Sequence, residues 1–409
     1  MGKAMKAMKS RRAMKAMKVM RAMKAMKATR ATVKVMKDSL PMLPLIQENY
    51  NRTAAQAWVS LVTDCSGMEA PVMALKAMDV QVLHLAASES NQACAKFLKE
   101  NFHPRKFFDS VARDNVKEDA PKRPDLYVTG FPCQNWSVAG LKKGALDEKN
   151  GPVIMDVIRY IAYAKPKAFV LENVEGLMTT FGSELAAIVK TLKTLDENRY
   201  KVDYAVLCAS EHGIPQRRRR LWIVGIDKSV AKHDFKWPPK LSLTPPLSLI
   251  LDSLDSLPTA SDAPPTSQTV AVRNWRNGLI KILVDGHNPF LEDYVLDIDG
   301  SKLGAVMHNM SPCQTRQRHA GHWVTSRGRR MRLVEQIKLM GMRPSDLKWK
   351  GVVTDTQLAQ MVGNSMCLSV LERIFYRLLP AAGLARPAQL KGRWESYTTS
   401  VDTLWRLRS

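Results

Sequence analysis

The sequence is best approached from residues 130–137, which read Gly130-Phe131-Pro132-Cys133-Gln134-Asn135-Trp136-Ser137. They follow a short apolar run, residues 126–128, that predicts a β-strand ending in a loop. Pro132 fixes its own φ and favours an extended conformation before it, so the turn is stiff. In an open α/β sheet, ligands and chemistry lie at the carboxyl ends of strands. A cysteine on such a turn is either a nucleophile or a buried structural residue, and the rest of the chain must decide.

The charge of the chain favours a polyanionic partner. The 409 residues carry a net charge of +24, and residues 1–37 contain 13 Lys or Arg and no acid, which leaves +11 on the rest. Nucleic acid is the first expectation and an acidic membrane surface the second. No apolar run approaches the length of a membrane span, so no membrane partner is expected.

Residues 1–37 form a low-complexity repeat of Ala, Met and Lys with a basic residue at every third position from 3 to 30. In an α-helix with about 3.6 residues per turn, a basic residue at every third position shifts gradually round the axis, so no apolar face forms. We therefore expect a disordered arm. It is interpreted as a nucleic-acid-binding or nuclear-import arm, which predicts a nuclear protein. An organelle presequence and a merely solvating tail are the alternatives.

The six cysteines are widely spaced and form no C-x-x-C pair. A disulfide framework is therefore not expected, and the sequence predicts a protein of a reducing compartment. His319 and His322 follow Cys313 at a spacing that fits no structural zinc pattern, so no metal is predicted.

From Trp58 onward, apolar strands alternate with helices, which predicts a parallel sheet with helices on both faces. The fold class is α/β, a Rossmann-like doubly wound sheet. Strands are expected at 59–62, 80–85, 126–128, 168–171, 204–207 and 221–224, and helices at 72–78, 91–101, 153–164 and 185–195. In such folds the first turn holds a nucleotide-like cofactor and an acid after the second strand binds its ribose. Gly67 and Glu89 occupy these places, although an ordinary turn and a solvated acid would look the same.

Four segments then follow in order: Pro132-Cys133-Gln134, Glu172-Asn173-Val174, the run from Gly213 through Gln216 to Arg220, and Gln360–Ser365. Together they resemble the cytosine-C5 DNA methyltransferases, over about residues 58–226 and 327–375. The resemblance implies the fold of a class I methyltransferase, with S-adenosyl-L-methionine as cofactor. It also implies double-stranded DNA as partner, with the target cytosine flipped out of the stack.

The resemblance assigns catalytic roles to Cys133, Glu172, Arg218 and Arg220. Cys133 would add to carbon 6 of cytosine so that carbon 5 can accept the methyl group. Glu172 would donate to N3 as a carboxylic acid with a raised pKa, the alternative being a helix-terminal acid or a salt bridge. Arg220 would hold the charge on O2, with Arg218 supporting the pocket. The arginines between them are expected to face phosphate or solvent; a purely electrostatic patch is the alternative.

By the same match, the cofactor would be bound by Ser66, Gly67, Met68, Glu89, Asp109, Pro132, Asn364 and Ser365, with Asp114 as the alternative to Asp109. The first cofactor motif departs from the family's Phe-x-Gly-x-Gly. Cys65 stands at its aromatic position and Glu69 at its second glycine.

DNA contact is expected from the catalytic loop, a basic flap and a recognition domain: Gln134, Ser137, Lys142, Lys143, Gln216, Arg316 and Arg318. The recognition domain is placed at 227–326, with a Pro-rich linker and strands at 279–284 and 294–298. His319, His322 and Trp323 add aromatic and basic groups for phosphate contact and base stacking, or else belong to a solvated basic loop. The core is expected at 58–226 and 327–379, with a closing helix at 366–379, and 380–409 as a tail without an assigned role.

The sequence thus predicts a monomeric DNA (cytosine-5-)-methyltransferase. An RNA cytosine methyltransferase of the same fold is the second hypothesis, although the Cys-Phe-Thr tripeptide of the family member acting on tRNA is absent. A third is a catalytically inactive DNA-binding protein, which the altered cofactor motif suggests. The joint presence of Cys133, Glu172 and Arg220 argues against it.

Overall fold

The computed structural model describes residues 56–111, 120–132, 151–253 and 263–407. The basic arm, the alternative cofactor residue Asp114 and the segment from Cys133 to Asn150 lie outside these ranges. The predictions for Cys133, Gln134, Ser137, Lys142 and Lys143 therefore concern residues outside the described part.

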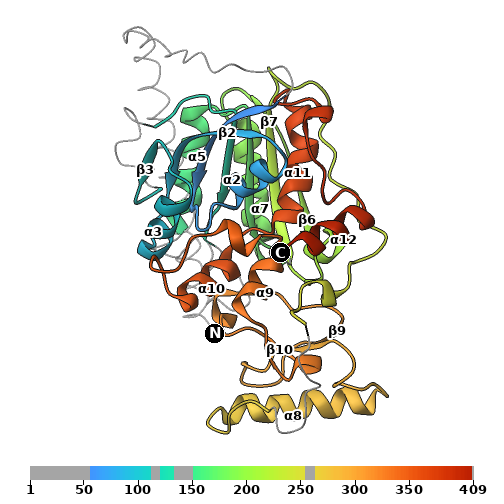
Figure 1. Ribbon diagram of the computed structural model, residues 1–409. Helices are drawn as coiled ribbons and strands as arrows, with labels where there is room; N and C mark the ends of the chain where they lie inside the picture. The colour runs from blue at the N-terminus through green and yellow to red at the C-terminus, as the bar shows by residue number, and fades with distance from the viewer. Residues whose placement is uncertain (1–55, 112–119, 133–150, 254–262, 408–409) are drawn as a thin grey trace, which may run out of the picture. The chain divides into compact units, whose positions relative to one another are not determined.

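Seven strands form the central sheet in the order β3-β2-β1-β4-β5-β7-β6 (Figure 1). Their bounds are β1 (Trp58–Asp64), β2 (Gln81–Ser88), β3 (Lys106–Phe108), β4 (Leu126–Gly130), β5 (Ala168–Val174), β6 (Tyr200–Cys208) and β7 (Arg219–Asp227). β7 is antiparallel to both of its neighbours, while the pairs from β3 to β5 are parallel. The predicted α/β class is confirmed, but the sheet is not wholly parallel. Only a short 3₁₀ helix (Ala209–His212) and a turn join β6 to β7, and a connection without a crossover helix makes antiparallel neighbours.

Helices cover both faces of this sheet (Figure 1). Leu126 and Val128 of β4 enter one apolar cluster, which also holds residues of α2 (Ala70–Ala77) and α11 (Leu368–Ala381). Tyr127 enters the other, with residues of α5 (Gly151–Ala164) and α7 (Gly182–Thr194). The alternation follows from the two-residue period of a strand. The remaining helices of the core are α3 (Gln92–Asn101), α6 (Gly176–Thr179), α9 (Leu333–Lys338) and α10 (Asp355–Asn364).

A second, antiparallel sheet has the order β11-β10-β8-β9, from β8 (Tyr294–Leu296), β9 (Val306–His308), β10 (Trp323–Val324) and β11 (Arg329–Arg330). Helix α8 (Thr269–Val284) packs on it. The strand expected at 279–284 is therefore wrong. Isoleucine and valine there suggested a strand, but the buried residues of α8 recur at helical spacing: Ala271, Trp275, Gly278 and Ile282.

The C-terminal residues, which the sequence left as a tail without an assigned role, pack in the core. Trp394 is almost fully buried, and so are Leu404 of α12 (Tyr397–Arg406) and Leu407 directly after this helix. All three belong to the apolar cluster that holds residues of α2 and α11. Gly213, at φ +97°, lies against them: a Cβ there would come within 2.7 Å of Ser400 Oγ. These residues therefore support the turn that leads into Gln216–Arg220. No helix in the described ranges is long and apolar enough to cross a bilayer.

Candidate active site

Glu172 and Arg220 meet across two adjacent antiparallel strands. Glu172 lies opposite Trp222, and Arg220 lies opposite Val174, so the acid and the arginine are diagonal neighbours on one face. Arg220 Nε is 3.2 Å from Glu172 Oε1. The structure thus brings together two residues that are 48 positions apart in the sequence and were both predicted to contact the base.

Burial of Glu172 raises the pKa of its carboxyl above the usual value, and the charges of Arg220 and Arg218 only partly offset this. The side chain is 8% exposed. A carboxyl group that stays protonated near neutral pH can donate a hydrogen bond or a proton, which is what a general acid requires. The raised pKa therefore favours the protonated form of Glu172, which could act as a donor beside the positive charge of Arg220.

Arg218 is buried and binds three backbone carbonyls. Its Nη1 donates to the carbonyl of Gln314 at 2.7 Å, and its Nη2 donates to that of Ser365 at 2.5 Å; both nitrogens also lie within 3.3 Å of the Gly363 carbonyl. The guanidinium therefore joins the start of β7, the loop before β10 and the end of α10. Gly363 allows this approach, because a Cβ there would lie 2.3 Å from the Thr315 backbone. These contacts make Arg218 a positioning residue that supports the pocket.

The intervening arginines, Arg217 and Arg219, are exposed, as the alternation predicts. Arg219 donates two hydrogen bonds of 2.8 Å to the carboxylate of Glu175.

The turn that leads to Cys133 is tied to the same edge of the sheet. Gly130 pairs with Glu172 in the β4–β5 register. Asn173 Nδ2 donates to the carbonyl of Phe131 at 3.2 Å, one residue before Pro132. Asn173 is 1% exposed and acts as an anchor for this turn, a role that the sequence did not reveal.

The predicted cofactor turn follows β1, and its geometry suits a ribose. Glu89, just after β2, accepts the N–H of Gly67 at 2.8 Å through one oxygen and the N–H of Asn91 at 2.8 Å through the other. A carboxylate has about four acceptor positions, so two remain for a diol. Asp109 follows β3, where the N–H of Glu89 donates to the carbonyl of Phe108 at 3.0 Å, so the two acids stand at the same edge. A Cβ at Gly67 would meet open space, which leaves room for a ligand against the turn.

Glu69, at the family's second glycine, has a left-handed backbone (φ 57°) and a fully buried side chain. Its Oε1 accepts from Thr63 Oγ1 at 2.7 Å, and Thr63 Oγ1 accepts from Ser66 Oγ at 2.9 Å. His84 Nε2 lies 3.2 Å from the same hydroxyl. Burial raises the pKa of Glu69 to about 8 and lowers that of His84 to about 4, so both are neutral near pH 7 and form no ion pair.

Two of the predicted cofactor side chains serve the turn instead of facing a ligand. Met68 is 1% exposed and packs in the core, so its side chain offers no cofactor surface. The Ser66 hydroxyl donates to Thr63 and holds the turn. Pro132 stays partly exposed and Asn364 exposed, while the carbonyl of Ser365 is bound by Arg218.

One predicted DNA contact, that of Gln216, is wrong. Gln216 is fully buried: its Nε2 donates to the Leu339 carbonyl at 2.9 Å and its Oε1 accepts from the Gln314 N–H at 3.1 Å. It therefore fixes the loop before β10 and has no surface for DNA. Arg318 binds Asp297 through two hydrogen bonds of 2.7 and 3.1 Å. Arg316 is exposed.

The aromatic part of the predicted cluster is buried. His322 and Trp323 are 1% and 5% exposed, and Trp323 packs edge-on against Trp275 of α8 at 6.5 Å between ring centroids. Base stacking on Trp323 is therefore wrong. The sequence misleads at this position because a Trp beside arginines has the composition of both a nucleic-acid surface and a small core.

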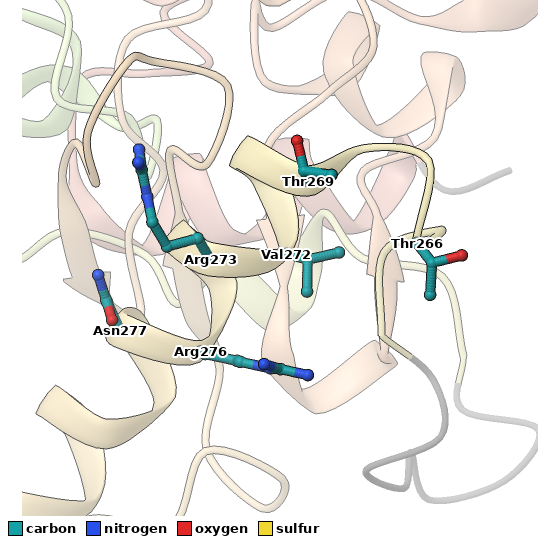
Figure 2. A pocket seen from close by; sticks show the side chains of 6 residues that line it. All are labelled: Thr266, Thr269, Val272, Arg273, Arg276 and Asn277. Carbon is teal, nitrogen blue, oxygen red and sulfur yellow. The ribbon is translucent and has the colours of Figure 1, made fainter.

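An open hollow of about 280 Å³ lies along the N-terminal half of α8 (Figure 2). Its lining combines two hydroxyls, an amide and two guanidinium groups: Thr266, Thr269, Val272, Arg273, Arg276 and Asn277. None of the predicted catalytic or cofactor residues lines it. No group of three His, Cys, Asp or Glu within the described ranges could hold a metal ion.

The seven-stranded sheet and the acid–arginine pair at the end of β5 define a class I methyltransferase. Residues 57–379 match the model of a family described as "C-5 cytosine-specific DNA methylase". The chain belongs to this family. The family and fold class predicted from the sequence are confirmed, and the reaction and cofactor of the family are those predicted.

Relatives share moderate identity with the chain. Type II methyltransferase M.SsoII of Shigella sonnei is 31% identical over 69% of this chain and 72% of its own length. Type II methyltransferase M.BsuFI of Bacillus subtilis is 28% identical over 70% of this chain and 65% of its own length. The chain thus spans about two thirds of these proteins. The crystal structure of S. pombe Dnmt2 methyltransferase matches with a TM-score of 0.55 at 14% identity, over 79% of this chain and 98% of that one, which shows a shared fold.

Proposed function

We propose that the protein transfers a methyl group from S-adenosylmethionine to carbon 5 of cytosine in double-stranded DNA. The observation that carries the proposal is the buried Glu172 carboxyl, whose pKa is raised by burial, held 3.2 Å from Arg220 beside the anchored turn at Phe131 that leads to Cys133. Family membership supports the same reaction. Both named relatives are called type II methyltransferases.

In this proposal the cofactor supplies the methyl group, and Gly67, Glu89 and Asp109 hold its nucleoside part. Cys133 adds to carbon 6 of a flipped cytosine, which makes carbon 5 nucleophilic. Glu172 gives a proton to N3 as the ring gains electrons, and Arg220 stabilises the charge on O2. After methyl transfer, a water or another base removes the C5 proton, the bond from Cys133 to carbon 6 breaks, and N3 returns its proton to Glu172. Arg218 keeps the loop before β10 against this pocket.

We further propose that residues 227–326 recognise the DNA and that the protein acts as a monomer. The hollow on α8 supports a contact with phosphate, because two exposed arginines and two threonine hydroxyls line it (Figure 2). The nuclear location stays a prediction, since it depends on the arm.

The experiment is covalent trapping on DNA that carries 5-fluorocytosine. Fluorine cannot leave as the C5 proton does, so a working enzyme stays attached through Cys133. An adduct with the parent and none with Cys133→Ser would support the proposal. An adduct on the corresponding RNA alone would favour the RNA enzyme, and no adduct on either, with salt-sensitive DNA binding retained, would favour an inactive DNA-binding protein.

A further inference from the structure

Cys313 lies beside the two arginines of the candidate active site. Its Sγ is 3.5 Å from Nη2 of Arg220 and 3.6 Å from Nη1 of Arg218. As a thiol, Cys313 would donate through its Sγ to the carbonyl of Gln314 at 3.4 Å, an oxygen that also accepts the 2.7 Å bond from Arg218. The side chain is only partly exposed. The sulfur therefore faces mainly positive charge.

Two guanidinium groups share this site with one buried carboxyl group. Burial raises the pKa of Glu172, the carboxyl 3.2 Å from Arg220, and so opposes its ionised form. Cys367 interacts with Arg218, but burial raises the pKa of its thiol, so it is neutral. Positive charges that are shielded from water require a counter-ion. Within the described residues, Cys313 is the remaining acidic group that contacts both arginines.

We propose that Cys313 is a thiolate and a positioning residue: it serves as counter-ion to Arg220 and so allows Glu172 to keep the proton that methyl transfer uses. The inference rests on the proposed function. A negative charge at position 313 would offset part of the charge of Arg220 and so reduce the pull of that arginine on the Glu172 carboxyl, which favours its protonated form.

The acidity of the thiol agrees with this geometry. Burial raises the pKa of Cys313, but the charges of Arg220 and Arg218 and their hydrogen bonds outweigh burial, so the pKa lies below its usual value. Arginine neighbours are a recognised cause of low thiol pKa values.

The first test does not depend on activity. The ultraviolet absorbance of thiolates is titrated in the Cys133→Ser protein and compared with the double variants Cys133→Ser/Cys313→Ser and Cys133→Ser/Cys208→Ser. We expect the first double variant to lose about one thiolate at about pH 7, and the control at Cys208 to lose none. Equal absorbance in all three proteins would overturn the proposal.

The second test follows the acid group. Once trapping has established that the parent is active, the pH profile of kcat/KM is compared with those of Cys313→Ser and Cys313→Asp. We expect the alkaline limb of Cys313→Ser to fall about 1 pH unit lower, with about tenfold loss above it, and Cys313→Asp to restore the limb because it restores the negative charge. A uniform loss across the whole profile in both variants would mean a merely structural role. If the parent forms no adduct, the proposed function fails, while the absorbance titration still decides the state of Cys313.

Discussion

The carboxylate of Glu89 accepts the backbone N–H of Gly67 at 2.8 Å and thereby joins the ends of β1 and β2. One residue thus shapes the turn and presents its remaining acceptor positions beside it. This pairing explains how the cofactor turn keeps its form although Cys65 and Glu69 replace two residues of the family motif.

Replacing Glu89 by Ala should weaken S-adenosylmethionine binding by about ten- to a hundredfold, because hydrogen bonds to a charged group contribute about 1.5–3 kcal/mol. Glu89→Gln keeps one acceptor oxygen, so its Kd for the cofactor should lie between the values of the parent and of Glu89→Ala. Calorimetric titration with the cofactor measures both. An unchanged Kd in Glu89→Ala, with the fold intact by circular dichroism, would remove Glu89 from the cofactor site.

Glu69 should make stability depend on pH. Its carboxyl has a pKa near 4.5 when unfolded and about 8 when folded. Between these values the unfolded chain releases the proton and the folded chain keeps it, so the parent loses stability as pH rises from about 4.5 to about 8. Glu69→Gln removes this loss.

Urea unfolding at pH 5.5 and at pH 8 tests this linkage. Relative to the parent, Glu69→Gln should gain on the order of a few kcal/mol between the two pH values. His84 also titrates, since the pKa of its imidazole is about 4 in the fold and 6.5 in the unfolded chain, but it is present in both proteins and so cancels in the comparison. A pH-independent difference would mean that Glu69 titrates normally in the fold.

Much of this site was predictable because strand ends converge. The motifs at Glu172 and at Gly213–Arg220 end or begin strands, and parallel or adjacent strands bring such residues to one edge. The sequence could not show which of these side chains would be buried inside the protein instead of facing a ligand. Gln216 and Met68 have the residue types and spacing of ligand-binding positions, yet three-dimensional packing buries them.

The errors outside the site have a similar cause. The C-terminal half of α8 contains β-branched residues that favour a strand locally, and only the small sheet that it covers selects the helix. The burial of Trp394 likewise depends on a partner far along the chain, the turn at Gly213.

Glu172→Gln should lower kcat by about 10²- to 10⁴-fold, the usual contribution of a general acid, while the Kd for DNA changes little. The neutral amide keeps the size of the side chain but has no proton to transfer. Glu175→Gln is the matched control, since that acid pairs with Arg219 at the surface. Single-turnover methylation with labelled cofactor measures both. A kcat for Glu172→Gln within threefold of the parent would assign the proton to another group.

Arg276 should contribute to DNA affinity through phosphate and not through sequence. It is exposed on α8 and lines the hollow with Arg273, whose guanidinium donates to the Ser301 carbonyl (Figure 2). Removing one cationic group from a phosphate reduces the slope of log K against log salt by about 0.9. Arg276→Ala should therefore weaken binding equally for cognate and unrelated duplexes and flatten the salt dependence by about that amount.

Arg159→Ala on α5 is the control for net charge, because it also removes an exposed arginine, from a helix that packs on the central sheet. Fluorescence anisotropy at several salt concentrations gives the slopes of both variants. If Arg276→Ala keeps the slope of the parent, or if it weakens only one DNA sequence, the hollow on α8 is not a phosphate site. A loss confined to one sequence would instead make Arg276 a base-reading residue, since phosphate contacts carry no sequence information.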